Sequence, residues 1–259
     1  MDEAVQLAAE RLRQAGTLRR PCPPVHRLLG GSREAAYAVQ HLVTELQAIG
    51  GAQVWGRKVM ALNGADDLEC GTLTDTMLRV DGCTVTGREL VDPSIAACLV
   101  FAVEQRLIGT EDNVQIQRCV GPVRAALEIL DRRVTAVDAT SVDMIADNLS
   151  AGLLVLGDDV DSQTGPGPWK WRVLLGGTRL TAATDITWSD VAAALRELAL
   201  VAVEHDRPLA AGEFVAFSSF GAAVPLVEDG LYIAEVDGRA AARVSFVAST
   251  GPAADEEAS

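Results

Sequence analysis

The stretch from Ala125 to Gly157, AALEILDRRVTAVDATSVDMIADNLSAGLLVLG, constrains the fold of this chain more than any other. It contains two apolar segments that are typical of buried strands, joined by a polar crossover and an Asn/Ser turn. Because side chains alternate along a strand, Glu128 shares a face with Leu130 and opposes Leu127 and Ile129. A carboxylate among apolar neighbours needs a partner, so this strand is the first candidate for a functional site.

Composition limits the class of protein. A chain of 259 residues with 49% hydrophobic content can bury one sizeable core, in one large domain or in a small one fused to a larger one. A formal charge of −14 and a pI near 4.6 argue against nucleic-acid binding, since no run of Lys and Arg offsets them. The longest apolar runs have about half the length that spans a bilayer.

The five cysteines are far apart and show no CxxC or Cys/His pairing with zinc-ligand spacing. Together with the missing signal peptide, this pattern predicts a reducing, cytoplasmic environment.

The N-terminal region predicts two helices and a connector. The spacing of apolar residues indicates an amphipathic helix that ends at Gly16. The proline-rich segment PCPPVHRLLGG from Pro21 must be extended, and it carries His26. A second helix is expected from Ser32, a plausible N-cap, to Gly50.

Lysine stands out in the following segment, AQVWGRKVMALN, which reads as a strand. Lys58 lies there among apolar residues, either as an edge residue that reaches solvent or as a buried cation held for chemistry. The next segment, ADDLECGTLTDTML, reads as a loop that contains Glu69. A turn at Asp92-Pro93 then precedes a long buried strand.

The second half predicts mainly short strands. A hairpin is expected across Gly176-Gly177, and a helix capped by Ser189 and Asp190 follows it. The remaining segments up to Val247 read as strands with turns, and the acidic end, residues 250–259, is expected to be a disordered tail.

Two motifs carry a resemblance to a known family. The pattern ALEIxDxR followed by DxIADNxSxG resembles the 2-keto-4-pentenoate hydratase and 4-oxalocrotonate decarboxylase family, within the fumarylacetoacetate hydrolase-like superfamily. An AYxVQ helix after the proline-rich connector, the Gly56-Arg57-Lys58 strand and the SSFGAAVP segment from Ser218 to Pro225 extend this resemblance over nearly the whole chain. It implies an α+β fold with a rolled, mixed β-sheet and flanking helices. We expect an N-terminal segment of residues 1–80, a catalytic-type domain of residues 81–249 and the tail.

The resemblance also implies a metal site that this sequence does not preserve. The family holds a divalent cation with an E-x-E pair on the long strand and a third carboxylate on the ALEI strand. Aligning DPSIAACLVFAV to that pattern puts Ala96 and Cys98 at the positions of the two glutamates, which leaves Glu128 alone. Asp92 lies four residues before Ala96, too far along an extended strand to replace a ligand. One carboxylate beside a neutral thiol is a poor magnesium site, so we expect no metal ligands and no cofactor.

The remaining polar residues define the expected site. The candidate catalytic residues are Lys58, Glu69, Glu128 and Ser150, and the candidate substrate-binding residues are His26, Asn148, Ser218 and Ser219. Glu69 occupies the place of an aspartate in the Asp-(Tyr/Phe)-Gly pattern of the family, which here reads Glu-Cys-Gly. Without a cation, Glu128 either has a raised pKa or pairs with Lys58, and both arrangements suit acid/base chemistry. A purely structural Lys/Glu pair, with Asn148 and Ser150 merely capping a turn, is the alternative.

Three hypotheses follow for the function. The first is a metal-independent lyase or isomerase that hydrates, dehydrates, cyclises or moves protons on a small carbonyl or enol compound, in a biosynthetic pathway. The second is ordinary metal-dependent hydration of a 2-hydroxyalka-2,4-dienoate or decarboxylation of 4-oxalocrotonate, with Mg or Mn held by other residues. The third is a catalytically silent partner of an active relative. The resemblance also implies a homo-oligomer that binds a small molecule, without a membrane or nucleic-acid partner.

Overall fold

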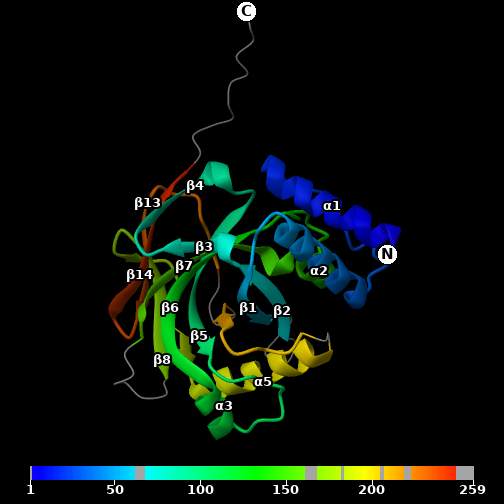
Figure 1. The fold of residues 1–259 in the computed structure, drawn as a ribbon. Helices are drawn as coiled ribbons and strands as arrows, with labels where there is room; N and C mark the ends of the chain where they lie inside the picture. The colour runs from blue at the N-terminus through cyan, green and yellow to red at the C-terminus, as the bar shows by residue number, and fades with distance from the viewer. Residues whose placement is uncertain are drawn as a thin grey trace, which may run out of the picture.

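Strands from distant parts of the sequence pair into two sheets in the computed structural model (Figure 1), which describes residues 2–61, 68–160, 168–181, 184–204, 207–218 and 223–248. The helices are α1 (Glu3–Leu18), α2 (Arg33–Ile49), α3 (Asn113–Cys119), α4 (Ser141–Ala146) and α5 (Trp188–Glu204), with short turns η1 (Asp75–Met77), η2 (Gly87–Glu89) and η3 (Asn148–Ser150). The strands are β1 (Val54–Ala61), β2 (Leu68–Thr74), β3 (Leu78–Val80), β4 (Cys83–Thr86), β5 (Pro93–Val103), β6 (Val120–Asp131), β7 (Ala151–Asp159), β8 (Trp169–Leu175), β9 (Thr178–Arg179), β10 (Thr184–Ile186), β11 (Phe214–Phe217), β12 (Val224–Pro225), β13 (Gly230–Val236) and β14 (Arg239–Val247).

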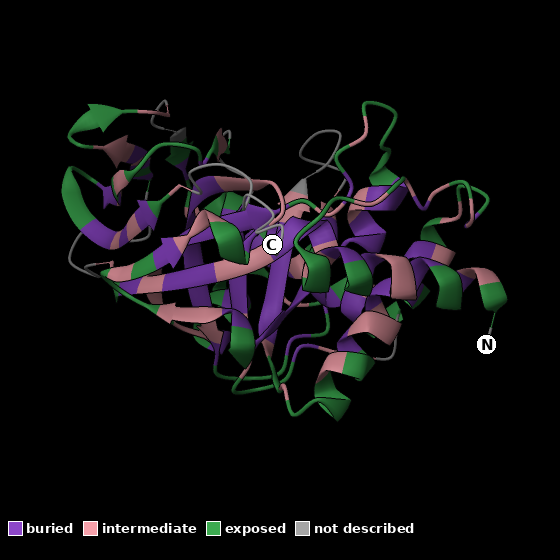
Figure 2. Ribbon diagram, turned by 90° about the horizontal axis from the view of Figure 1, so that it is seen from above, coloured by how far each residue is buried: buried purple, intermediate pink, exposed green. Residues whose placement is uncertain are grey.

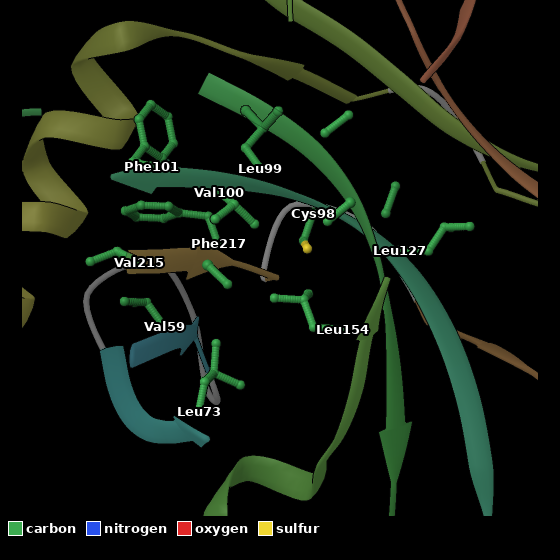
Figure 3. Close-up of a cluster of buried hydrophobic side chains, with 14 of the residues drawn as sticks. Val59, Leu73, Cys98, Leu99, Val100, Phe101, Leu127, Leu154, Val215 and Phe217 are labelled. Atoms are coloured by element: carbon green, nitrogen blue, oxygen red, sulfur yellow. The ribbon is translucent and has the colours of Figure 1, made fainter. Parts of the chain in front are cut away.

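The larger sheet is built around β5 and β6. Within the described ranges its strand order is β2, β1, β11, β5, β6, β7, β3, and β12 adds to β5. β1 runs parallel to β11 and β3 runs parallel to β7, whereas β5 and β6 pair antiparallel, so the sheet is mixed. Its central strands curve strongly, as Figure 3 shows. The expected α+β architecture with a rolled, mixed sheet is therefore confirmed.

The second sheet has the order β10, β8, β13, β14, β4, and β9 pairs with β8. It packs on the larger sheet, where Phe101 of β5 meets Trp169 of β8 with ring centroids 6.5 Å apart. The strands β1, β2 and β3 all precede residue 81 and belong to the same sheet as β5 to β7. The boundary expected between residues 80 and 81 therefore does not separate two sheets.

Helices α1, α2 and α4 surround a smaller apolar cluster beside the sheets (Figure 1). Ser32 caps α2 by accepting a hydrogen bond from the backbone N–H of Ala35, and the helix ends at Gly50, as predicted. α1 continues past Gly16, so the expected glycine stop was wrong by two residues. The helix ends because Arg19 adopts a left-handed conformation, with φ 54°, and its N–H bonds the carbonyl of Ala15. None of the helices in the described ranges is long and apolar enough to cross a lipid bilayer.

The main core lies between the sheets, where Figure 2 shows the central strands as almost entirely buried. On β5, Leu99 and Phe101 point away from Cys98, which lies on the other face of the strand (Figure 3). The Phe101 and Phe217 rings meet edge to face, with centroids 5.3 Å apart. The aromatic residues thus fill the face toward the second sheet, and the opposite face carries Cys98 and Glu128, both buried.

Two local predictions differ from the structure. The segment expected to be a loop around Glu69 forms β2, because its residues pair with β1 from Val54 to Ala61. Helix α5 is capped by Thr187 and not by Ser189. Both the N–H and the hydroxyl of Thr187 donate to the Asp190 carboxylate, at 2.8 and 2.6 Å. The hairpin across Gly176-Gly177 is confirmed, with φ angles of 55° and 87° at these glycines, although its second strand is short.

Candidate active site

Strand register places Lys58 and Glu128 on one face of the larger sheet. Lys58 pairs with Ala216 of β11, and Ala96 of β5 pairs directly with Glu128 of β6. Directly paired residues in a sheet share a face, and alternate residues of one strand do so as well. Cys98 therefore lies on the same face as Ala96 and Glu128. The structure places Ala96 and Cys98, the positions that the resemblance assigns to two glutamates, beside Glu128.

Lys58 and Glu128 form a buried ion pair on this face. Their side chains are 0% and 2% exposed, and the Lys58 ammonium contacts Glu128 Oε1. The ammonium also donates to the carbonyl oxygen of Leu149 at 2.9 Å. The second carboxylate oxygen, Glu128 Oε2, is buried and has no hydrogen-bond partner among the described residues. Buried polar atoms are rarely left unpaired, and this oxygen is therefore a candidate proton acceptor.

An unusual turn supplies the Leu149 carbonyl. Asn148, Leu149 and Ser150 have φ angles of 54°, 52° and 56°, a conformation that non-glycine residues seldom adopt. Asn148 holds this turn against β2, since its side-chain amide accepts from the N–H of Thr72 and donates to the Thr72 carbonyl, both at 2.7 Å. The amide of Asn148 is thus occupied by the backbone, and its position orients the acceptor for Lys58. Strain of this kind persists where the surroundings enforce it.

The close packing of Lys58 and Asn148 against β2 requires a glycine at position 71. A Cβ atom there would lie 2.9 Å from Lys58 Cγ and 3.0 Å from two oxygen atoms of Asn148. We therefore expect Gly71→Ala to lower the free energy of unfolding by about 1–3 kcal/mol, measured by urea denaturation. Gly16→Ala is the control, because a Cβ in that helix meets only Arg133 Cδ at 3.8 Å. The control should be neutral or slightly stabilising, and equal effects of the two variants would contradict the packing argument.

Glu69 lies in a different cluster. Its carboxylate accepts two hydrogen bonds from Arg33, at 2.7 and 2.9 Å, and a third from the Tyr37 hydroxyl at 2.6 Å. No hydrogen bond or ion pair within the described ranges joins Glu69 to Lys58 or Glu128. Glu69 shares the face of Lys58 by register, since it pairs with Met60, but helix α2 supplies the partners of its carboxylate. Sequence reasoning overlooked Arg33 and Tyr37, although their i, i+4 spacing puts them on one helix face.

His26 and Ser150 have no hydrogen bond to Lys58 or Glu128 among the described residues, although Ser150 directly follows Leu149. His26 Nδ1 is 2.6 Å from Asp143 Oδ2, and Asp143 also accepts backbone N–H groups of Val25, His26 and Thr140. Burial favours the neutral form of Asp143, but these hydrogen bonds outweigh it and lower its pKa. Ser150 is buried and lines a cavity of about 260 Å³ beside α4, together with Asp143. The arrangement around Asp143 anchors the proline-rich connector to α4.

Ser218 follows β11 and is 4% exposed. Its N–H donates to the carbonyl of Val59 at 3.3 Å, and its hydroxyl is buried without a hydrogen-bond partner among the described residues. Alternation along β11 puts it on the face of Ala216 and Lys58. Ser219, the other serine expected to bind substrate, lies outside the described residues, as does the tail of residues 250–259.

A second buried pair, Arg133 and Asp147, holds the two ends of the turn formed by Asn148, Leu149 and Ser150. The Arg133 guanidinium contacts the Asp147 carboxylate and donates to the carbonyls of Asp147 and Ala151, at 3.0 and 3.1 Å. Burial raises the pKa of Asp147 to about 6, although Arg133 opposes this effect. The motif DxIADN contained both aspartates of this region, but sequence gave no signal for their partners.

The raised pKa of Asp147 predicts that the stability of the protein depends on pH. Its folded pKa of about 6 exceeds the ordinary value of 3.8, so its stabilising contribution is complete below pH 3.8 and is lost as the pH rises through 6. The free energy of unfolding of the wild type, relative to that of Asp147→Asn, should therefore fall between pH 4 and pH 7, by up to about 3 kcal/mol. Urea denaturation of both proteins across this range checks the sign, and a relative gain in stability with rising pH would contradict it.

The donor set does not fit a magnesium or manganese ion. Within the described ranges, no group of three or more His, Cys, Asp and Glu side chains is arranged to hold a metal. At the positions beside Glu128, Ala96 offers a methyl group and Cys98 a thiol. Burial, and next the Glu128 carboxylate, raise the pKa of the Cys98 thiol well above its usual value, so the thiol stays neutral. Hard divalent cations prefer several oxygen donors, which this face lacks.

Comparisons with known proteins agree with this fold. No family model matches the chain. A 2-keto-4-pentenoate hydratase from Burkholderia vietnamiensis is 27% identical over 95% of this chain and 98% of its own length. The TodF product hydratase of Pseudomonas putida is also 27% identical, over 94% of this chain and 95% of its own.

Among solved structures, 4-oxalocrotonate decarboxylase from Pseudomonas putida G7, complexed with magnesium and adipate, superposes with a TM-score of 0.85 at 18% identity, over 95% of this chain and 98% of its own. Fumarylpyruvate hydrolase from Pseudomonas aeruginosa, in complex with Mn²⁺ and pyruvate, gives a TM-score of 0.55 at 12% identity, over 74% and 89% of the two chains.

The curved mixed sheet with its flanking helices is a fumarylacetoacetate hydrolase-like fold. In sequence, the chain is similar over nearly its whole length to 2-keto-4-pentenoate hydratases, as the two motifs predicted. The expectation of a hydratase-family lyase is confirmed at this level.

Proposed function

We propose that this protein is a lyase or isomerase that moves protons beside a carbonyl or enol group without a divalent cation. The observation that carries the proposal is the Lys58–Glu128 pair, buried next to Ala96 and Cys98 where the family places two further carboxylates. Hydration, dehydration, keto/enol transfer and cyclisation all share such a proton transfer. Because the carboxylates that hold the metal in the family are replaced here, we propose that the substrate also differs from that of the hydratases. A different substrate is in line with a role in a biosynthetic pathway.

The geometry supports one acid/base step in particular. Glu128 Oε2, which has no hydrogen-bond partner among the described residues, takes a proton from the carbon beside the carbonyl. The C–H electron pair becomes the enolate double bond, and negative charge develops on the carbonyl oxygen. An ammonium has three N–H donors, and Glu128 and Leu149 are its contacts among the described residues. The third donor of Lys58 stabilises the developing oxyanion.

The names of the relatives support a second candidate, metal-dependent hydration of a 2-hydroxyalka-2,4-dienoate. The likeness to hydratases extends over 95% of the chain. In this candidate, Mg²⁺ or Mn²⁺ would need oxygen donors beyond Glu128, and the described face offers Ala96 and Cys98 instead. The two candidates predict opposite effects of chelation, since only the second loses its activity with EDTA.

Deuterium exchange tests the proposal directly. In D₂O with EDTA, the wild type should catalyse exchange of the protons beside the carbonyl of pentan-2-one or 2-oxopentanoate, followed by ¹H NMR. The double variant Lys58→Met/Glu128→Leu should lose this catalysis, because both reacting groups are gone. It leaves no buried charge unpaired, so it should still fold. Wild-type exchange no faster than that of the folded double variant would contradict the proposal and favour a catalytically silent chain.

A further inference from the structure

We infer that the substrate presents an uncharged carbonyl or enol to Lys58 and Glu128, and not a carboxylate. The inference rests on the proposed function and names the chemical class of its substrate. A 2-oxo acid carries a full negative charge next to its reacting carbonyl. Binding that charge in a buried site requires an uncompensated cation nearby.

Every lysine and arginine of the chain lies in the part that the structure describes. The segments that the structure does not describe contain no lysine or arginine in the sequence, so all 22 of these residues lie in the described ranges. On the face that carries the site, the buried cation is Lys58, and Glu128 already neutralises it. The site therefore has a net charge near zero before substrate binds.

The buried or half-buried arginines around this sheet have carboxylates of their own. Glu69 binds Arg33 with both oxygens, and Asp147 contacts Arg133. Arg57, adjacent to Lys58 in β1, lies 3.6 Å from a carboxylate oxygen of Glu213. Arg124, opposite Val100 and four residues from Glu128 along β6, contacts the exposed Asp159. Recruiting Arg33 or Arg133 to a substrate carboxylate would leave Glu69 or Asp147 as a buried, unpaired anion. That exchange is strongly unfavourable, because a buried charge without a partner is costly.

The rest of the face suits an uncharged ligand. Strand register also puts the buried Glu69 on this face, where Arg33 and Tyr37 already bind its carboxylate. The buried residues closest in register to the pair are small or apolar: Ala96, Cys98, Val100, Ala126, Leu154 and Ala216. The hydroxyl of Ser218 is a neutral hydrogen-bond donor whose capacity is unused among the described residues. A hydroxyl and an already paired ammonium match a neutral carbonyl oxygen better than a carboxylate.

A matched pair of probes tests the charge preference. Pentan-2-one and 2-oxopentanoate share the same propyl ketone and differ by a methyl group in place of the carboxylate. For each probe, the exchange rate of the methylene protons beside the carbonyl is divided by the rate with Lys58→Met/Glu128→Leu. We expect the wild-type enhancement, as kcat/KM, to be larger for pentan-2-one by about tenfold or more. An equal or larger enhancement for 2-oxopentanoate would overturn the inference and leave the proposed function standing.

Binding to Glu128→Gln supplies a readout that does not depend on turnover. This variant leaves Lys58 without its counter-ion, so the site gains a net positive charge. Its Kd for 2-oxopentanoate, from NMR titration, should fall by about tenfold relative to wild type, with little change for pentan-2-one. An unchanged Kd for the anion would count against the inference even if neither probe exchanged, whereas absent exchange alone would contradict the proposed function.

Discussion

Replacing Glu128 with glutamine is expected to lower the rate of α-proton exchange by about 10²- to 10⁴-fold, the usual contribution of a general base. Glutamine has nearly the same shape as glutamate, and its amide oxygen still accepts from Lys58. What it loses is the ability to take a proton from carbon at neutral pH. The rate should be measured by ¹H NMR in D₂O with EDTA, at saturating pentan-2-one.

Asp158→Asn is the matched control for this prediction. Asp158 lies on β7 in the same sheet, is exposed and is remote in register from Glu128. The same change of carboxylate to amide should leave its exchange rate within about twofold of wild type. A Glu128→Gln protein that is folded and as active as this control would remove Glu128 from the mechanism.

The second large effect concerns stability. Lys58→Met leaves the Glu128 carboxylate buried without a cation, and breaking a buried pair in this way costs about 3–5 kcal/mol. Lys58→Met/Glu128→Leu removes both charges with little change in volume, so it should be within about 1–2 kcal/mol of wild type or more stable. The two variants thus separate the cost of an orphaned charge from the loss of packing.

Chemical denaturation of both variants measures this difference. Lys170→Met serves as the control, because the Lys170 side chain is 63% exposed and its carboxylate partner is 4.0 Å away. The control should change the free energy of unfolding by about 0.5 kcal/mol or less. If Lys58→Met were as stable as the control, Glu128 would have to be neutral or solvated in the folded protein.

The elements that sequence predicted well are those with a local cause. Ser32 caps α2, and the glycines at residues 176 and 177 form the hairpin turn, because both depend on neighbouring backbone groups. The alternation around Glu128 correctly placed it on the face opposite Leu127. The strand β2 was missed, since it forms by pairing with β1 and its own sequence resembles a loop.

The site was only partly predictable, because its polar contacts join distant parts of the chain. Lys58 and Glu128 could be proposed as a pair from their apolar surroundings. The Leu149 carbonyl could not, since it depends on three consecutive left-handed residues that no sequence pattern indicates. Likewise, the partners of Glu69 come from helix α2, more than thirty residues earlier in the chain.

In the proposed mechanism, the Lys58 ammonium takes the place of the divalent cation that the resemblance implies. The direct measurement is the metal content of the purified protein, by elemental analysis, together with its exchange rate before and after EDTA and with added Mg²⁺ or Mn²⁺. We predict far less than one divalent ion per chain and a rate that none of these treatments changes. One ion per chain, with activity that EDTA removes and Mg²⁺ restores, would contradict it.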